Sequence, residues 1–305
     1  MKFASGGSEP TSPGVTRQES FAPTRHGRLW VLSLTPAAPS GLPLVIVHGG
    51  PGISSDYLHS LGVLADERRV VFYDQIGVGR SERANDPSAW TVDAYVEHLE
   101  AVREHLGLDR FHLLGQSWGG FLALAYADVH AEHVASIILS SPLIDTDRWL
   151  GDAHALIAEL PPMYRASIEA GPEDAGYEAA QAEYYRRHFC HLDPWPPVLQ
   201  QGMDEMDADS YNAMWGPNEF TCAGVLAHDS RAAAIERLGV RNLWLTGTDD
   251  EARPQTIAGF AAMSPASKLV ILPGTHCVHL EQPQAYESAL REFLNAAQPG
   301  ATLSA

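Results

Sequence analysis

The strongest fold signal in the chain is a run of ten residues, Phe111-His112-Leu113-Leu114-Gly115-Gln116-Ser117-Trp118-Gly119-Gly120. Its apolar beginning predicts a buried strand, and residues 121–127 after it predict a helix. Between them lies a Gly-x-Ser-x-Gly sequence, the pattern that places a serine on a sharp strand-to-helix turn. Such a turn needs residues without a Cβ two positions before and after the serine, and Gly115 and Gly119 provide them. Ser117 is therefore the candidate nucleophile.

A second turn precedes this serine in the chain and follows the strand predicted at residues 42–47. Its sequence is His48-Gly49-Gly50-Pro51-Gly52. Acyl transfer puts negative charge on a carbonyl oxygen, and each backbone N–H group directed at that oxygen contributes about 3–4 kcal/mol. By analogy with the lipase-type arrangement, we expect the two donors of such an oxyanion hole to be Gly50 and Trp118. The alternative is an ordinary glycine turn after a strand.

The partners of a nucleophilic serine on such a turn follow it in the order acid, then histidine. Residues 242–246 predict a strand that runs into Gly247-Thr248-Asp249-Asp250-Glu251, and residues 267–272 predict another that ends in Pro273-Gly274-Thr275-His276. Open α/β sheets bind their ligands at the carboxyl ends of strands, where these side chains lie. We expect Ser117 to attack, His276 to accept and return the proton, and the acid to orient the imidazole.

Two choices remain within this triad. Asp249 adjoins Asp250, and spacing favours Asp250 as the acid. His279 lies three residues after His276, within the apolar beginning of the next predicted helix. A histidine in that position is more often a packed or solvated helix residue, so His276 is favoured as the base.

Apolar runs alternate with helical patterns along most of the chain. This alternation predicts a mostly parallel sheet covered by helices on both faces. The clearest helix spans Thr91–Leu106, where apolar residues recur at helical spacing. The predicted strands lie near residues 29–34, 44–47, 70–73, 111–114, 136–140, 243–246 and 269–272.

The strand pattern disappears between residues 143 and 237, where helical sequences rich in Ala, Glu and Tyr replace it. We therefore expect a helical cap, residues 143–237, inserted into a single core domain made of residues 23–142 and 238–305. Residues 1–22 are rich in Ser, Gly, Pro and Thr and are predicted to form a disordered tail.

Composition excludes several classes of function. The net charge of −18 argues against nucleic acid and anionic membrane surfaces as partners. The chain has no apolar run of the length of an export signal or a membrane span, which predicts a cytoplasmic protein that does not act at a membrane. Its cysteines, Cys190, Cys222 and Cys277, are expected to be free thiols.

No cofactor or metal is predicted. The chain lacks a phosphate-binding glycine loop and a dinucleotide-binding fingerprint. The pair His188 and His191 encloses Cys190, but no second cluster supplies the remaining ligands of a four-coordinate zinc site.

From about Pro23 to Leu294 the chain resembles the proline iminopeptidases, a family of α/β-hydrolases, and especially the branch with the tricorn-associated aminopeptidases and the L-amino acid amidases. The matching sequences are His48-Gly49-Gly50-Pro51-Gly52, Phe72-Tyr73-Asp74-Gln75 with Gly77, Gly79, Arg80 and Ser81, the turn around Ser117, and Gly216-Pro217-Asn218-Glu219-Phe220. The first and last of these are far more specific than the serine turn, which most serine α/β-hydrolases share.

The resemblance implies the α/β-hydrolase fold and a substrate with a free amino terminus whose ammonium is held by two glutamates. These map to Glu219 and to Glu251, which directly follows the catalytic acid; the same alignment selects Asp250 as that acid. An ammonium partly removed from water needs close carboxylates to offset its desolvation. Tyr211 resembles a position of the substrate pocket, and Phe220 is expected beside it. Without the resemblance, both glutamates would be interpreted as surface acids.

The resulting hypothesis is a metal-independent serine aminopeptidase or amidase. It would release an N-terminal residue, with proline favoured by the resemblance, from short peptides or amino acid amides through an acyl-enzyme. Two alternatives remain: an esterase or lactonase acting on a small metabolite, and a non-catalytic small-molecule receptor that retains the triad. The oligomeric state and the preferred leaving group are not predicted.

Overall fold

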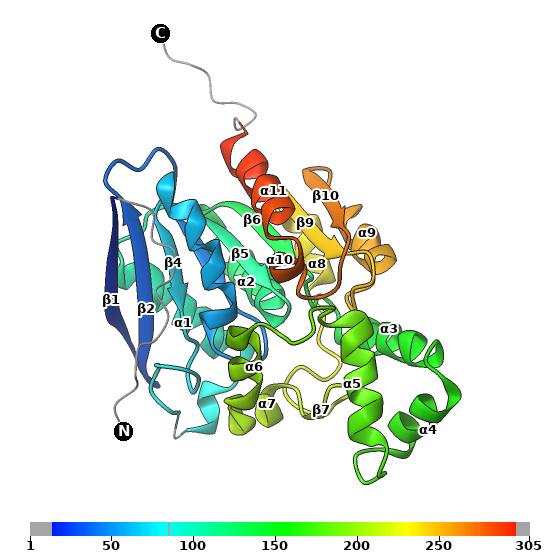
Figure 1. Ribbon diagram of the computed structural model, residues 1–305. Helices are drawn as coiled ribbons and strands as arrows, with labels where there is room; N and C mark the ends of the chain where they lie inside the picture. Colours follow the sequence, from blue (N-terminus) through cyan, green and yellow to red (C-terminus); the bar gives the residue numbers. More distant parts are fainter. Residues whose placement is uncertain (1–13, 85, 297–305) are drawn as a thin grey trace.

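The computed structural model of the protein describes residues 14–84 and 86–296 (Figure 1). Its centre is an eight-stranded sheet with the order β1-β2-β4-β3-β5-β6-β9-β10. The β1–β2 and β2–β4 pairs are antiparallel, and all other neighbours are parallel. The strands are β1 (Val15–Thr24), β2 (Gly27–Pro36), β3 (Leu44–Val47), β4 (Val70–Tyr73), β5 (Phe111–Gln116), β6 (Val134–Ser140), β9 (Asn242–Gly247) and β10 (Ser267–Leu272). The predicted mostly parallel sheet is confirmed.

The central strands are apolar because both of their faces are buried. Every residue of β3, β4, β5 and β6 is buried, and alternate side chains enter the cores on opposite faces of the sheet. In β3, Val45 and Val47 belong to the core beneath helix α2, whereas Leu44 and Ile46 belong to the core on the other face.

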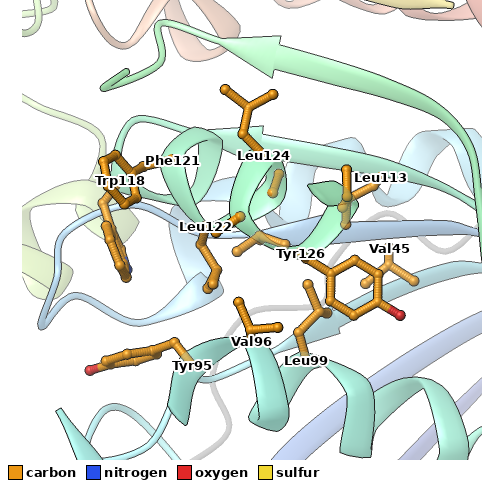
Figure 2. Close-up of a cluster of buried hydrophobic side chains, with 14 of the residues drawn as sticks. Val45, Tyr95, Val96, Leu99, Leu113, Trp118, Phe121, Leu122, Leu124 and Tyr126 are labelled. Atoms are coloured by element: carbon orange, nitrogen blue, oxygen red, sulfur yellow. The ribbon is translucent and has the colours of Figure 1, made fainter. Parts of the chain in front are cut away.

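Helices cover both faces of this sheet, as the alternating pattern predicted. Helices α1 (Val92–His105), α2 (Trp118–Val129), α8 (Ala232–Arg237) and α9 (Pro254–Ala261) pack on one face; η1 (Ser55–Asp66), α10 (Val278–Glu281) and α11 (Pro283–Asn295) pack on the other. Figure 2 shows Leu122 and Tyr126 of α2 facing Val96 and Leu99 of α1. Thr91 caps α1 by accepting a hydrogen bond from the Ala94 N–H at 3.1 Å, which explains where this helix begins.

The first strand corrects the prediction of a disordered tail over residues 1–22. Residues 15–22 belong to β1, which pairs with β2 at every position from Val15 to Thr24, while residues 1–13 lie outside the described part of the chain. Strand β1 stands at the edge of the sheet, so most of its side chains are exposed and polar. It therefore lacks the apolar run that marks the central strands.

Between β6 and α8 lies a segment that we call the helical insert, residues 141–231. In Figure 1 it forms the group of green to yellow-green helices beside one end of the sheet. It contains α3 (Thr146–Ala158), α4 (Pro162–Ala170), α5 (Tyr177–His188), α6 (Pro197–Asp204), α7 (Ala208–Met214) and a small hairpin of β7 (Pro217–Asn218) and β8 (Thr221–Cys222). The predicted cap extended to residue 237, but α8 packs against α2, so residues 232–237 lie with the helices of the core.

Two further short helices complete the fold, η2 (Pro87–Ala89) and η3 (Ala131–His133). Within residues 14–84 and 86–296, every helix is too short or too polar to traverse a lipid bilayer.

Candidate active site

Ser117 occupies the tight turn between β5 and α2. Its φ of 56° and ψ of −124° are values that a residue other than glycine rarely adopts. Backbone hydrogen bonds hold it there: the Ser117 N–H donates to Ser140 O at 3.0 Å, and the Leu143 N–H donates to Ser117 O at 3.1 Å. The surrounding structure thus imposes a conformation that costs on the order of 1–3 kcal/mol.

The two glycines of this turn are required by close backbone approach. A Cβ on Gly115 would overlap the backbone of Gly119, and a Cβ on Gly119 would overlap the carbonyl oxygens of Val47 and His48. The turn therefore packs directly onto the end of β3, which brings the glycine loop that follows β3 next to Ser117.

His276 and Asp250 form a buried pair, and His276 lines the same cavity as Ser117. His276 Nδ1 lies 2.9 Å from Asp250 Oδ1, and Asp250 is only 1% exposed. The same carboxylate accepts hydrogen bonds from the Ala252 N–H at 2.8 Å and from Thr246 Oγ1 at 2.9 Å. A carboxylate that only accepts hydrogen bonds holds the proton of the imidazole on Nδ1, which leaves Nε2 free to receive a proton.

The neighbouring candidates lie elsewhere. Asp249 is exposed, and its carboxylate accepts a hydrogen bond from Thr248 Oγ1 at 2.8 Å. His279 is buried in α10, with its ring centroid 5.6 Å from that of Tyr57, and burial lowers its pKa to about 3. Neither ring nitrogen of His279 has a hydrogen-bond partner among the described residues, so it is a neutral packing residue in this fold.

Because Asp250 is buried against His276 and Asp249 is exposed, substitution of each aspartate tests which one is the catalytic acid. Asp250→Asn is expected to lower kcat for an aminoacyl anilide by about 10⁴-fold, because an amide no longer fixes the imidazole in the required tautomer. Asp249→Asn, the matched control on an exposed side chain, is expected to leave kcat within about threefold. Steady-state kinetics of the two purified variants measure this, and the reverse ranking would assign the acid to Asp249.

The glycine loop is tied to the first turn of α2 through Gln75. His48 Nε2 accepts a hydrogen bond from the Gln75 N–H at 3.0 Å, and Gln75 Oε1 accepts one from Trp118 Nε1 at 2.9 Å. Burial lowers the pKa of His48, which keeps its ring neutral and able to accept that bond. Gly50, with φ of 109°, and Trp118 both line the cavity beside Ser117, as expected of the two predicted oxyanion-hole donors.

One partly open cavity brings most of the predicted site residues together. The space in it that is open to a water molecule is about 90 Å³. It is lined by Gly50, Ser117, Trp118, Tyr211, Glu219, Glu251 and His276, among others. No lysine or arginine is among its lining residues in the described part of the chain.

The two glutamates of this cavity have no lysine or arginine among its described lining residues; Glu251 is buried and Glu219 is partly buried. Glu251 is 4% exposed, its Oε1 lies 3.8 Å from His276 Nδ1, and its Oε2 has no hydrogen-bond partner in the described structure. Burial, together with the charges of Glu219 and Asp250, raises the pKa of Glu251 well above its ordinary value. Burial also raises the pKa of Glu219, against the charge of His276 and hydrogen bonds from Tyr185 and Trp149. Such a pair provides a binding site for a cation.

Ionising the buried carboxyl group of Glu251 costs folding free energy. We therefore expect its replacement to lower activity but to raise stability. A carboxyl group with a raised folded-state pKa binds its proton more tightly in the folded chain, so ionising it costs stability as the pH rises through that pKa. Glu251→Gln removes this cost and is expected to raise Tm by about 2–4 °C at pH 8. The gain is expected to shrink toward pH 5.

Thermal unfolding of the wild-type chain, of Glu251→Gln and of the exposed control Glu236→Gln measures this effect. The control is expected to shift Tm by less than about 1 °C at either pH. A Glu251→Gln variant that is less stable than the wild type at pH 8 would show that the carboxylate is not electrostatically strained.

The helical insert supplies residues that sequence reasoning missed. The carbonyl of His188, at the end of α5, accepts hydrogen bonds from the N–H groups of His276 at 3.0 Å and Glu251 at 3.2 Å. Phe189 stacks on the His276 ring at 5.7 Å, and Trp149 of α3 meets the same ring edge-on at 5.7 Å. The end of α5 thus fixes both loops that carry the predicted acid and base.

The prediction for the aromatic pocket requires one correction. Tyr211 lines the cavity, but Phe220 does not. Phe220 packs within the helical insert instead, with ring centroids 4.9 Å from Tyr184 and 6.5 Å from Tyr177. Glu219 and Phe220 lie next to each other in the turn between β7 and β8. Glu219 lines the cavity, whereas Phe220 packs toward α5 and holds the hairpin in place.

The cysteines are free, as expected, and Cys277 lines the cavity next to His276. Burial raises the pKa of the Cys277 thiol, so it is protonated at neutral pH. In residues 14–84 and 86–296, no three or more His, Cys, Asp or Glu side chains are placed to hold a metal ion.

Comparison with known proteins agrees with this geometry. The family model described as alpha/beta hydrolase fold matches residues 43–283. The proline iminopeptidase of Heyndrickxia coagulans is 36% identical over 263 residues, covering 84% of this chain and 91% of the relative. The proline iminopeptidase of Lactobacillus helveticus (strain DPC 4571) is 35% identical over 264 residues, covering 83% of this chain and 90% of the relative.

A solved structure of a proline iminopeptidase is also similar to this chain. The crystal structure of the proline iminopeptidase of Mycobacterium smegmatis superposes with a TM-score of 0.86 at 33% sequence identity. The superposition covers 91% of this chain and 97% of the other. The similarity therefore includes the helical insert as well as the sheet.

Proposed function

The chain belongs to the proline iminopeptidases, a family with the α/β-hydrolase fold, and from this membership we propose that it releases N-terminal proline from short peptides or amino acid amides through an acyl-enzyme. One observation carries the substrate class: the carboxyl groups of Glu219 and Glu251 line one cavity with Ser117 and His276, and no lysine or arginine of the described residues lines it. The pair is therefore suited to bind a cation, and the ammonium of a free amino terminus is such a group.

The chemistry of proline suits this pair. The protonated nitrogen of an N-terminal proline has two N–H bonds, so each can donate to one of the two carboxylates. Charge-assisted bonds of this kind are the strongest hydrogen bonds available to the site. They hold the ammonium at Glu219 and Glu251, which leaves the scissile carbonyl, two bonds away, within reach of Ser117.

In the proposed acylation, Ser117 Oγ attacks the carbonyl carbon while its proton passes to His276 Nε2. The Asp250 carboxylate stabilises the imidazolium through Nδ1. The N–H groups of Gly50 and Trp118 stabilise the oxyanion. The tetrahedral intermediate then expels the leaving amine, which takes the proton from His276.

Deacylation repeats these steps with water as the nucleophile. His276 accepts a proton from the water, the water oxygen attacks the acyl carbon, and the Ser117–acyl bond breaks. Proline leaves with its new carboxylate, and the proton returns from His276 to Ser117 Oγ. None of these reaction steps uses a metal ion or a cofactor.

The two alternative functions are less compatible with the site. An ester or lactone without an ammonium offers no cation to Glu219 and Glu251, so it gains no charge-assisted hydrogen bond from this pair. A pure receptor could retain the buried Asp250–His276 pair and Ser117, but the relatives that match most of the chain are named as peptidases, which favours turnover.

A panel of aminoacyl anilides tests the proposal. Proline anilide is expected to give the highest kcat/KM, ahead of alanine and leucine anilides, with one equivalent of aniline released for each proline. Binding of proline anilide without release of aniline would show a receptor. Faster hydrolysis of a simple acetate ester than of every anilide in the panel would favour the esterase.

A further inference from the structure

The residues that line the active-site cavity form two chemically different groups. One group holds Glu219 and Glu251, with Trp149 and Tyr185 hydrogen-bonded to Glu219. The other consists of apolar side chains from the loop after β3 and from α6 and the residues after it: Ile53, Leu199, Met203 and Met206, together with Tyr57.

The packing of these residues supports the division. Ile53, Tyr57 and Leu199 belong to the core on the η1 face of the sheet, and Met203 packs against it. Trp149 and Tyr211 pack against the core on the α2 face instead. The cavity therefore lies where the two cores meet, with Trp149 and the apolar wall packed on different cores.

The apolar wall is fixed to the loop that carries Gly50. Leu199 and Met203 are four residues apart on α6, so they share a face of that helix. Gly202 between them admits Ile53, since a Cβ there would lie only 2.9 Å from Ile53 Cδ1. The Asp207 N–H after α6 donates to Gly52 O at 2.8 Å, which ties the wall to the glycine loop.

This wall offers a ligand no polar partner. Among the side chains of this wall, the hydrogen-bonding group is the Tyr57 hydroxyl. It already accepts a hydrogen bond from the Gly49 N–H at 2.7 Å and donates one to Gln116 Oε1 at 2.6 Å. A polar or charged group bound here would lose its water without gaining a hydrogen bond.

We propose that this wall is the subsite for the leaving group, and that it selects substrates whose second residue carries a bulky apolar side chain. The inference rests on the proposed function: with the ammonium at Glu219 and Glu251 and the carbonyl at Ser117, the leaving nitrogen points away from the carboxylates. The second residue of the substrate, which is attached to that nitrogen, then contacts the wall. The flexible methionines accommodate leucine, methionine or phenylalanine alike.

The dipeptide amides Pro-Leu-NH2 and Pro-Asn-NH2 test this subsite, because their second side chains are similar in size, uncharged and different in polarity. On the wild-type enzyme, kcat/KM is expected to be at least about 10-fold higher for Pro-Leu-NH2. In Met203→Gln, which adds a polar amide to the wall, the ratio of the two values is expected to fall by about threefold or more.

The same substitution at an exposed methionine provides the control. Met163 of α4 is 70% exposed, and Met163→Gln is expected to leave the ratio unchanged. Equal kcat/KM for the two substrates on the wild-type enzyme would overturn the subsite while leaving the aminopeptidase function intact. Failure to cleave either substrate or proline anilide would overturn the proposed function as well. Because the wild-type ratio is measured independently, the test survives a Met203→Gln variant that does not fold.

Discussion

Replacing Ser117 by alanine is expected to lower kcat for proline anilide by about 10⁴- to 10⁶-fold, because only the oxyanion-hole and binding contributions remain. The same change is expected to abolish covalent labelling by a serine-directed phosphonate. Folding is expected to survive, since no hydrogen bond of the Ser117 side chain stabilises the turn of α2 and the backbone bonds of Ser117 remain.

Labelling followed by mass spectrometry and thermal unfolding of the same sample distinguish loss of the nucleophile from loss of the fold. A variant that unfolds at the wild-type temperature but takes up no phosphonate would identify Ser117 as the nucleophile. Stoichiometric labelling of Ser117→Ala would show that another side chain attacks the substrate.

The second large effect is expected at the carboxylate pair. Glu219→Gln removes one charged acceptor from a buried site while the substrate's ammonium keeps its charge, and losing one partner of a desolvated charge pair costs a few kcal/mol. We expect kcat/KM for proline anilide to fall by about 10²-fold or more. Hydrolysis of a small acetate ester, which has no ammonium, is expected to change by less than about threefold.

The comparison of the two substrates within one variant makes this result specific. A general disturbance of the cavity would lower both activities, because the same Ser117 and His276 act on both. Equal losses would therefore mean that Glu219 supports the site's structure and does not bind the amine. The glutamate control Glu236→Gln is expected to alter neither activity.

The sequence was most informative where burial constrains the residue type. The central strands are buried on both faces, so they appear as continuous apolar runs, and Gly115 and Gly119 mark a turn that leaves no room for a Cβ. Strand β1 was missed because an edge strand with exposed side chains has no such run. Its pairing with β2 depends on backbone hydrogen bonds, which leave little trace in the sequence.

The helical insert was harder to predict, because its contacts are long-range. Trp149 and Phe189 contact His276 from α3 and from the end of α5, more than 80 residues away in the chain, and no local pattern indicates this. Phe220 is expected beside Tyr211 in the pocket, but successive residues of a hairpin turn point in different directions, and Phe220 packs against Tyr184 instead. Resemblance to a family identified the glutamates; only the packed structure shows that both line one cavity, with no lysine or arginine among its described lining residues.

The most direct test of amine recognition compares proline anilide with N-acetylproline anilide on the wild-type enzyme. Acetylation removes the positive charge and both N–H donors while leaving the scissile bond unchanged. We expect kcat/KM to fall by at least about 10³-fold, because the acetylated nitrogen carries no charge and donates no hydrogen bond to Glu219 or Glu251. Cleavage of the acetylated substrate at the same rate as the free one would contradict the assignment of this carboxylate pair to the substrate's amino terminus.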